Sequence, residues 1–392
     1  MTLSLLALEA GFRWHKWRRL TFDPLAGGYP DEITYQHPLY HHRYYANVAV
    51  KEWKADYDVV YTTNDLGLRG ARRYGPKPAG VKRLLMLGDS FTFGIGVNDD
   101  EPFSAVIQQE MDPRRARIEV INAGVGSYSP ILHYLTLRDL YLPLEPDAVI
   151  LWFDVTDLQD DYLYERHLRY DAQGRLVACN SDYVRGHRDW VRPVLRRSAM
   201  ANYFYSKFAG TYEKIGMLGW RAYLGAKLRG DDTKLNAVHM TAARRAHVDL
   251  LKYDRLLMVR GLATPAELER YWERTGGYLL RIQDLLRARD IPFALGLYPN
   301  AVQVGPNQWA EGRVYRMFDK GRTYDDPFPF TFIEAFARAH DIPVINTTPA
   351  FLAARDQELY YRWDGHFTPA GHRVLASHLL RDPTFRRLIE TF

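Results

Sequence analysis

Short apolar runs alternate with helical patterns over two parts of this chain. The apolar runs are typical of buried parallel strands, and they lie at residues 83–87, 118–121, 147–153, 292–297 and 342–345. Helices are expected at residues 101–111, 130–142, 276–289, 330–340 and 369–381. This alternation predicts an α/β fold, a three-layer α/β/α sandwich whose mostly parallel five-stranded sheet lies between helices.

Two stretches interrupt or precede the alternation. Residues 1–80 are rich in Tyr, His, Arg and Pro without a long periodic run, and we expect an irregular N-terminal arm lying on the main domain. Residues 158–275 lack strand patterns and separate the third and fourth strands, which predicts an inserted helical subdomain. That insertion has two interpretations, a lid over the site or a packing elaboration that touches no ligand. The α/β domain then comprises residues 81–157 and 276–392.

Composition excludes few functions. The chain has 392 residues and a formal net charge of +5, and without a Lys/Arg block we expect no nucleic-acid partner. A lone cysteine, Cys179, excludes an intramolecular disulfide and a cysteine-based metal site, and the histidines show no metal-ligand spacing. We therefore expect no metal and no other cofactor. Asp160 and Asp161 are interpreted as a solvated turn.

The N-terminal run Leu3–Leu8 is apolar but far shorter than the ~20 residues of a spanning helix. It is interpreted as a short docking helix, giving peripheral membrane association, or as the tail of an anchor lost to truncation or a late start codon.

The sharpest chemical pattern is the run Gly88-Asp89-Ser90-Phe91-Thr92-Phe93-Gly94, directly after the first strand. A serine at this bend exposes its hydroxyl at the carboxyl edge of the sheet, where ligands of such sheets bind. Amide dipoles of a helix that starts nearby help to hold negative charge there. A Gly-Asp-Ser triplet is also a good turn or helix cap, so it needs a partner to indicate chemistry.

A candidate partner follows the last predicted strand. Asp364 can accept a hydrogen bond from one ring nitrogen of His366, which leaves the other nitrogen to face Ser90. Thr368 is a suitable N-cap and Pro369 a suitable first helical residue, which places His366 in the loop beyond the strand. The pattern indicates a serine nucleophile with a histidine base and an orienting aspartate.

Together these stretches resemble the SGNH (GDSL-like) hydrolase superfamily. Gly88, Asp89 and Ser90 match its first block, and His366 to Gly371 resemble its last, which has an Asp just before the His. Asp364 stands two residues before His366 rather than the commoner three, a variant that resembles polysaccharide O-acetyltransferase relatives. The resemblance covers about 82–157 and 276–385, and it implies a flavodoxin-like fold and serine-dependent acyl chemistry.

The resemblance also implies an oxyanion hole built from Ser90, Gly126 or Ser127, and Thr156. By its spacing from Asn122, Ser127 occupies the place of the family's glycine, and Gly126 is adjacent; only a backbone N–H is needed there. Thr156 replaces the family's Asn, whose amide donates to the oxyanion, and losing one such donor can cost about 3 kcal/mol of transition-state stabilisation. Asp157 is expected to brace the loop.

These patterns predict a hydrolase that removes acyl groups, usually acetyl, through an acyl-enzyme on Ser90. The substrate is then an acylated small molecule or polysaccharide. Two alternatives stay open: transfer of the acyl group to a sugar hydroxyl of an envelope polysaccharide, or an impaired module that binds a glycan or a protein. The Asp–His spacing and the apolar N-terminal run favour transfer slightly. Because similar relatives are often membrane-anchored and face the periplasm, a periplasmic or membrane-associated location is favoured over a cytoplasmic one.

Overall fold

The computed structural model describes residues 7–14, 33–180, 254–316 and 318–390, together with positions 200 and 224. The central sheet is parallel and has the strand order β11-β10-β7-β5-β6. Its strands are β5 (Lys82–Gly88), β6 (Ile118–Gly124), β7 (Ala148–Phe153), β10 (Phe293–Leu297) and β11 (Val344–Asn346). The predicted five-stranded α/β fold is confirmed.

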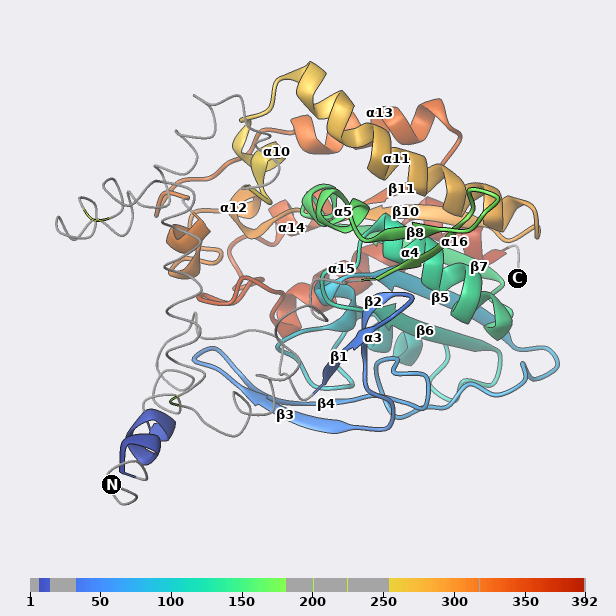
Figure 1. The fold of residues 1–392 in the computed structure, drawn as a ribbon, viewed down its shortest axis with the longest axis horizontal. Helices are drawn as coiled ribbons and strands as arrows, with labels where there is room; N and C mark the ends of the chain where they lie inside the picture. The colour runs from blue at the N-terminus through green and yellow to red at the C-terminus, as the bar shows by residue number, and fades with distance from the viewer. Residues whose placement is uncertain are drawn as a thin grey trace.

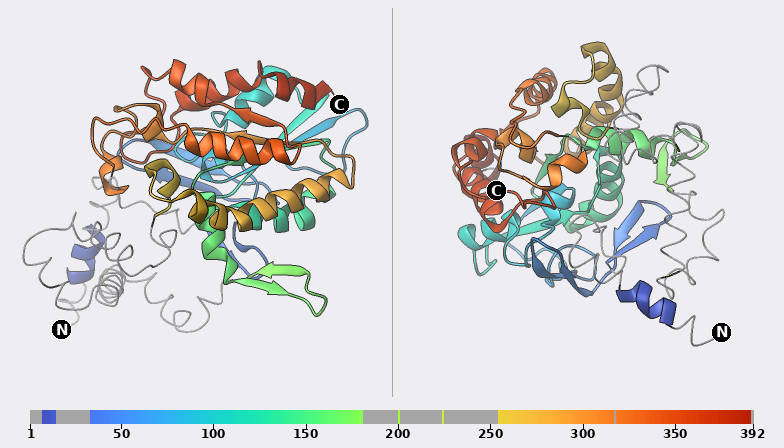
Figure 2. Two further views of the ribbon diagram at one scale, coloured as in Figure 1. Left: turned by 90° about the horizontal axis from the view of Figure 1, so that it is seen from above. Right: turned by 90° about the vertical axis from the view of Figure 1, so that its left-hand side faces the viewer.

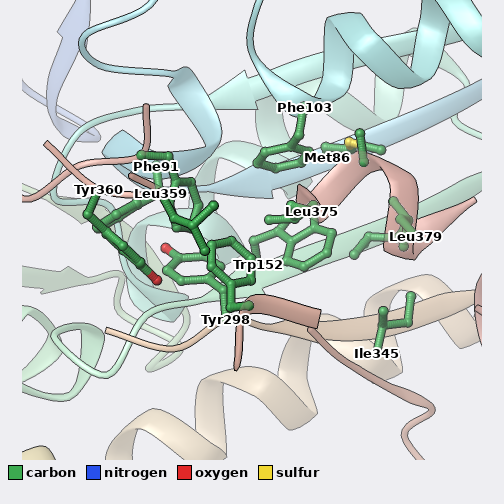
Figure 3. Close-up of a cluster of buried hydrophobic side chains, with 14 of the residues drawn as sticks. Met86, Phe91, Phe103, Trp152, Tyr298, Ile345, Leu359, Tyr360, Leu375 and Leu379 are labelled. Atoms are coloured by element: carbon green, nitrogen blue, oxygen red, sulfur yellow. The ribbon is translucent and has the colours of Figure 1, made fainter. Parts of the chain in front are cut away.

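Both faces of the sheet are buried. In β7, Ile150 and Trp152 face one apolar core, whereas Val149, Leu151 and Phe153 face the other. Because successive side chains of a strand point to opposite faces, a strand covered on both sides must be apolar throughout. The first core contains Trp152 at its centre, with Met86, Phe103 and Leu375 around it (Figure 3).

Helices form the two outer layers (Figure 1). Apolar residues of α3 (Phe103–Met111), α14 (Thr348–Ala353), α15 (Pro369–Leu379) and α16 (Pro383–Glu390) complete the first core. The second core is completed by α5 (Asp157–Glu165), α11 (Pro265–Arg287) and α13 (Phe328–Ala339), with α4 (Pro130–Thr136) beside α11. Figure 2 shows α15 and α16 on the side of the molecule opposite α11.

Two predicted helices differ in extent. The helix expected at 130–142 ends as α4 at Thr136 and continues as a π-turn (Leu137–Tyr141) and a 3-10 turn (Leu142–Leu144). The helix expected from residue 276 begins at Pro265, because Thr264 and Glu267 form a capping box there. The boundary drawn at residue 275 therefore falls inside α11.

The N-terminal arm is not irregular over its described part. It forms two antiparallel hairpins, β1 (Thr34–His37) with β2 (His41–Tyr44), and β3 (Ala49–Trp53) with β4 (Asp58–Thr62). Val59 and Tyr61 alternate with more exposed neighbours and pack into a third apolar cluster against Phe93. The prediction was wrong because strands of four or five residues are too short to establish a periodic pattern.

The stretch 158–275 also contains a hairpin that its sequence did not suggest. After α5, strands β8 (Leu168–Tyr170) and β9 (Leu176–Cys179) pair antiparallel. Asp160 and Asp161 are buried on α5 and are not a solvated turn, because Asp160 pairs with Arg255 and Asp161 accepts the Ser129 hydroxyl. Short α10 (Leu257–Arg260) precedes α11. The rest of the predicted helical subdomain lies largely outside the described residues, so both interpretations of it stay predictions.

Most of the apolar run Leu3–Leu8 likewise lies outside the described residues, although residues 7–14 are helical. Within the described part of the chain, no helix has both the length and the apolar character needed to cross a membrane.

Candidate active site

Ser90 lies at the carboxyl edge of the sheet, where β5 turns into the short helix α2 (Ser90–Phe93). The Asp89 carboxylate caps this turn by accepting the Phe91 N–H at 2.9 Å. Gly88 is required because a Cβ there would lie 2.1 Å from the Thr92 hydroxyl oxygen. The bend and its cap therefore follow from local sequence.

The structure brings Ser90, His366 and Asp364 into one hydrogen-bonded chain. The Oγ atom of Ser90 lies 2.9 Å from Nε2 of His366, and Nδ1 of His366 bonds to Oδ1 of Asp364. A carboxylate can only accept, so Nδ1 carries the proton and Nε2 is left to accept the Ser90 hydroxyl proton. This is the tautomer in which a histidine can act as a base toward a serine.

The loop that carries His366 is held from both sides. Thr368 caps α15 by accepting the Gly371 N–H at 3.3 Å, with Pro369 in the first turn, as the sequence predicts. The His366 ring lies against Phe91, with 4.8 Å between ring centroids. Gly365 adopts a φ of 84° with the Trp309 ring 2.9 Å from where a Cβ would stand, so a larger residue is excluded there.

Asp364 is nearly buried and has partners besides His366. The Lys54 ammonium donates to its Oδ2 at 2.8 Å, and the Tyr57 hydroxyl donates to the same atom at 3.3 Å. Burial would raise the pKa of Asp364, but His366 and Lys54 hold it well below its ordinary value. Asp364 is therefore ionised throughout the range in which a histidine base works.

The expected oxyanion donors are not equally available. The Gly126 N–H donates to the Tyr44 hydroxyl at 2.9 Å, and its carbonyl accepts from His42 Nε2 at 2.7 Å, so Gly126 has to be removed from the expected set. Ser127 lines the cavity, at a φ of 57°, and its carbonyl accepts from the Tyr164 hydroxyl at 2.7 Å.

Thr156 also lines the cavity, but its donors are directed elsewhere. Its N–H donates to the Asp154 carboxylate at 2.6 Å, and its hydroxyl bonds to the same carboxylate. Asp157 accepts the Asp154 N–H at 3.4 Å, which fits the expected bracing of this loop. Burial raises the pKa of both Asp154 and Asp157.

Asp89 is held on the side of the cap that faces the core. The Tyr298 hydroxyl donates to its Oδ1 at 3.0 Å, and Tyr298 lies with Phe91 and Trp152 in the aromatic cluster of Figure 3. Burial, and next the nearby Asp154 carboxylate, raise the pKa of Asp89. This carboxyl supports the bend, and its Oδ2 also lies 3.5 Å from the Ser90 hydroxyl, which can donate to it.

A cavity of about 270 Å³ opens above Ser90 and His366. Besides these two residues and Asp364, the cavity is lined by residues of the β3–β4 hairpin, of the loops after β6, β7 and β10, and of the segments 254–256 and 309–316. These contribute Glu52, Lys54, Ser127, Asp154, Thr156, Arg255, Leu256, Asn300, Trp309 and Arg316. No group of three or more His, Cys, Asp or Glu side chains in the described ranges is arranged to hold a metal ion.

Glu52, Lys54 and Tyr57 were missed by the sequence reasoning. They come from the N-terminal segment, about 310 positions before Asp364, and no motif marks them. Burial alternates along β4 in the structure, but its sequence has Val59, Val60 and Tyr61 in a row, so no apolar–polar alternation could have identified this segment.

Comparisons with known proteins give distant likenesses only. No family model matches the chain, and no curated protein matches it in sequence. Among solved structures, it resembles the acetyl xylan esterase AlAXEase (13% identity, TM-score 0.37, 76% of this chain and 98% of that one). It also resembles a catalytic mutant of Axe2, an acetylxylan esterase from Geobacillus stearothermophilus (13% identity, TM-score 0.35, 79% and 95%), and a lipolytic G-D-S-L family member from Veillonella parvula (12% identity, TM-score 0.33, 78% and 99%). At these values the function has to be argued from the site itself.

Proposed function

We propose that this protein is a serine-dependent hydrolase of acyl esters. The observation that carries the proposal is the unbroken hydrogen-bonded chain from Ser90 through His366 to the ionised Asp364, at the base of an open cavity. The Ser90 hydroxyl lies 2.9 Å from Nε2 of His366, and this nitrogen is unprotonated because Nδ1 donates to Asp364. This arrangement meets the geometric requirement for nucleophilic catalysis.

In the first half-reaction the Ser90 oxygen attacks the ester carbonyl carbon while His366 Nε2 takes the hydroxyl proton. The tetrahedral intermediate then collapses, the carbon–oxygen bond to the alcohol breaks, and His366 returns the proton to the leaving alkoxide. In the second half-reaction His366 takes a proton from water, the resulting hydroxide attacks the acyl-Ser90, and the acid is released. Asp364 keeps its charge throughout and stabilises the imidazolium that forms twice.

For the developing oxyanion we propose the backbone N–H groups of Ser90 and Ser127. Ser90 is the first residue of α2, so its N–H has no partner within the helix and the helix dipole points toward it. Ser127 lines the same cavity. Thr156 contributes indirectly, because it holds Asp154 and shapes the wall.

The cavity favours a small acyl group on a polar alcohol. A volume of about 270 Å³ accommodates an acetyl-sized group with part of the alcohol. Asn300, Trp309 and Arg316 supply an amide, an aromatic ring and a guanidinium on the lining, which are groups that bind sugar hydroxyls and ring faces.

Transfer of the acyl group to a sugar hydroxyl is the second candidate, and the two-residue separation of Asp364 and His366 favours it. The chemistry at Ser90 is the same, and only the second nucleophile differs. Adding a glycan acceptor to the turnover assay separates the two, because transfer gives an acylated glycan in place of free acid.

The test is fluorophosphonate labelling beside turnover of p-nitrophenyl acetate. Native protein should label and turn over, whereas Ser90→Ala should do neither. Ser377→Ala is the matched control, because Ser377 is an exposed serine on α15 and its variant should behave as native. Folded native protein that neither labels nor hydrolyses any short acyl ester would overturn the proposal and favour a binding role.

A further inference from the structure

The turn between β3 and β4 docks on the loop that carries Asp364. The Asp56 carboxylate accepts the backbone N–H groups of Trp363 and Asp364 at 2.8 and 2.9 Å. The Tyr57 ring packs on Tyr361, with 5.0 Å between centroids. The N-terminal segment therefore holds both the backbone and the side chain of the loop that carries Asp364.

Lys54 lies at the centre of this contact, between two carboxylates. Its Nζ is 2.8 Å from Oδ2 of Asp364 and 3.3 Å from Oε1 of Glu52. The side chains of Lys54, Asp364 and Glu52 are only 13%, 10% and 8% exposed. Glu52 is held in turn by the Tyr61 hydroxyl, which donates to its Oε2 at 2.5 Å.

The position of the Lys54 ammonium suits it to orient Asp364 as well as to neutralise its charge. The two oxygens of Asp364 are divided between partners, with Oδ1 facing His366 and Oδ2 facing Lys54. Holding Oδ2 fixes the carboxylate plane and so aims Oδ1 at the imidazole. Burial would lower the pKa of Lys54, but Asp364 and Glu52 raise it above its ordinary value, so the ammonium stays charged.

We propose that Lys54 is a positioning residue of the active site, whose ammonium orients Asp364 so that Asp364 in turn orients His366 toward Ser90. Glu52 balances the Lys54 charge so that the imidazolium formed during catalysis is not opposed by an unpaired cation. This inference rests on the proposed function, and it makes the β3–β4 hairpin part of the active site.

Other titratable groups surround the Lys54, Asp364 and His366 side chains and are left unchanged in every variant. Asp89, Asp154 and His372 interact electrostatically with His366. Asp56 and Tyr57 bond to Asp364, and Tyr61 bonds to Glu52.

The first experiment replaces Lys54 by Met, which keeps the length of the side chain and removes the charge. Lys51→Met is the matched control, because Lys51 lies on β3, which ends one residue before Lys54, and pairs with Asp58 at the surface, both about 60% exposed. For Lys54→Met, kcat should fall about 10- to 100-fold with KM nearly unchanged, the same range as when a side chain that orients a metal-binding residue is removed. Lys54→Arg should recover most of the loss, since it restores a cation between the carboxylates.

The pH profile provides a readout that loss of packing alone would not move. Removing a positive charge near His366 favours its protonated form, so the acidic limb of kcat/KM should shift to higher pH in Lys54→Met and not in Lys51→Met. A loss confined to KM would mean that Lys54 binds substrate, and an unshifted limb with native kcat would mean a purely structural pair. Either result overturns the inference.

Folding and the proposed function are controlled separately. Because removing one partner of a buried pair leaves an uncompensated charge, Lys54→Met/Glu52→Gln serves as a second variant, and melting curves accompany both. Ser90→Ala in the same assay tests the proposed function, which fails if this variant stays active. An inactive Ser90→Ala together with a native-like Lys54→Met would contradict only the role of Lys54.

The downfield proton resonance of the His366 Nδ1–H group provides a test that requires no turnover. It should shift in Lys54→Met, and an unchanged resonance would contradict the inference.

Discussion

Replacing Asp364 by Asn tests how the site holds its base, because the change keeps the shape and alters which atoms can donate. The carboxylate accepts from His366 through one oxygen and from Lys54 through the other. An amide has one oxygen and one NH₂ group, so only one partner can keep its acceptor. If the NH₂ group faces His366, Nδ1 must accept, Nε2 carries the proton, and Ser90 loses its base.

The competition between the two partners sets the size of the effect. A hydrogen bond from a charged donor such as Lys54 is worth about 1.5–3 kcal/mol, against about 0.5–1.5 kcal/mol for a neutral pair such as His366 and an amide. The difference of about 1–2 kcal/mol favours the unproductive orientation by roughly 5- to 30-fold. With loss of the negative charge that stabilises the imidazolium, kcat of Asp364→Asn should fall by about 10⁴-fold.

The same competition predicts that Lys54→Met has opposite effects on kcat in the native protein and in Asp364→Asn. In the native background Lys54→Met should lower kcat, whereas in the Asp364→Asn background it should raise kcat by up to about 5- to 30-fold, because the amide oxygen is then free to turn to His366. The assay is p-nitrophenyl acetate turnover by the four proteins of this cycle, with stability checked by melting. A double variant no more active than Asp364→Asn would refute the proposed division of the two oxygens.

Three further predictions concern packing and pH. Gly296→Ala should lower the unfolding free energy by about 1–3 kcal/mol in urea titrations, because its Cβ would lie 2.4 Å from the buried Trp152 ring; an unchanged midpoint would contradict the overlap. Tyr44→Phe leaves the Gly126 N–H without its acceptor and should cost about 1–3 kcal/mol of stability; native stability would mean that this contact is dispensable. Burial lowers the pKa of His133 to about 3. Below pH 6.5 His133 is therefore protonated in the unfolded chain but stays neutral in the folded chain, and stability falls as pH falls. Between pH 7 and pH 5, His133 should account for a loss of about 2 kcal/mol of unfolding free energy, and His133→Phe should not show this loss. If the unfolding free energies of the two proteins changed equally with pH, the prediction would be wrong.

Much of the α/β framework was predictable because its information is local. A parallel strand covered on both faces must be a continuous apolar run, so residues 83–87 and 147–153 identified β5 and β7 within a residue or so. Hairpins β1–β2 and β3–β4 were not predicted, because such short, half-exposed strands carry little periodic information. Helix α11 was begun 11 residues late because its capping box at Thr264 was overlooked.

The site was predictable in part for a topological reason. Parallel strands bring their carboxyl ends to one edge, so a serine after β5 and a histidine after β11 were expected to approach each other although they are 276 positions apart. Whether a given N–H stays available is a different matter. Gly126 and Ser127 are neighbours in sequence, and only the packing of Tyr44 and His42 against Gly126 separates their availability.

Local sequence is enough to identify the buried strands, the backbone bend at Ser90, and the residue types at the carboxyl edge of the sheet. These follow from periodicity, capping and chain direction, which act over a few residues. The tertiary structure alone decided that Lys54 and Glu52 surround Asp364, because that contact forms only when a hairpin and a C-terminal loop pack together and bury a lysine between two carboxylates. Contacts of this kind depend on the position of whole elements, and a linear pattern of residues does not encode them locally.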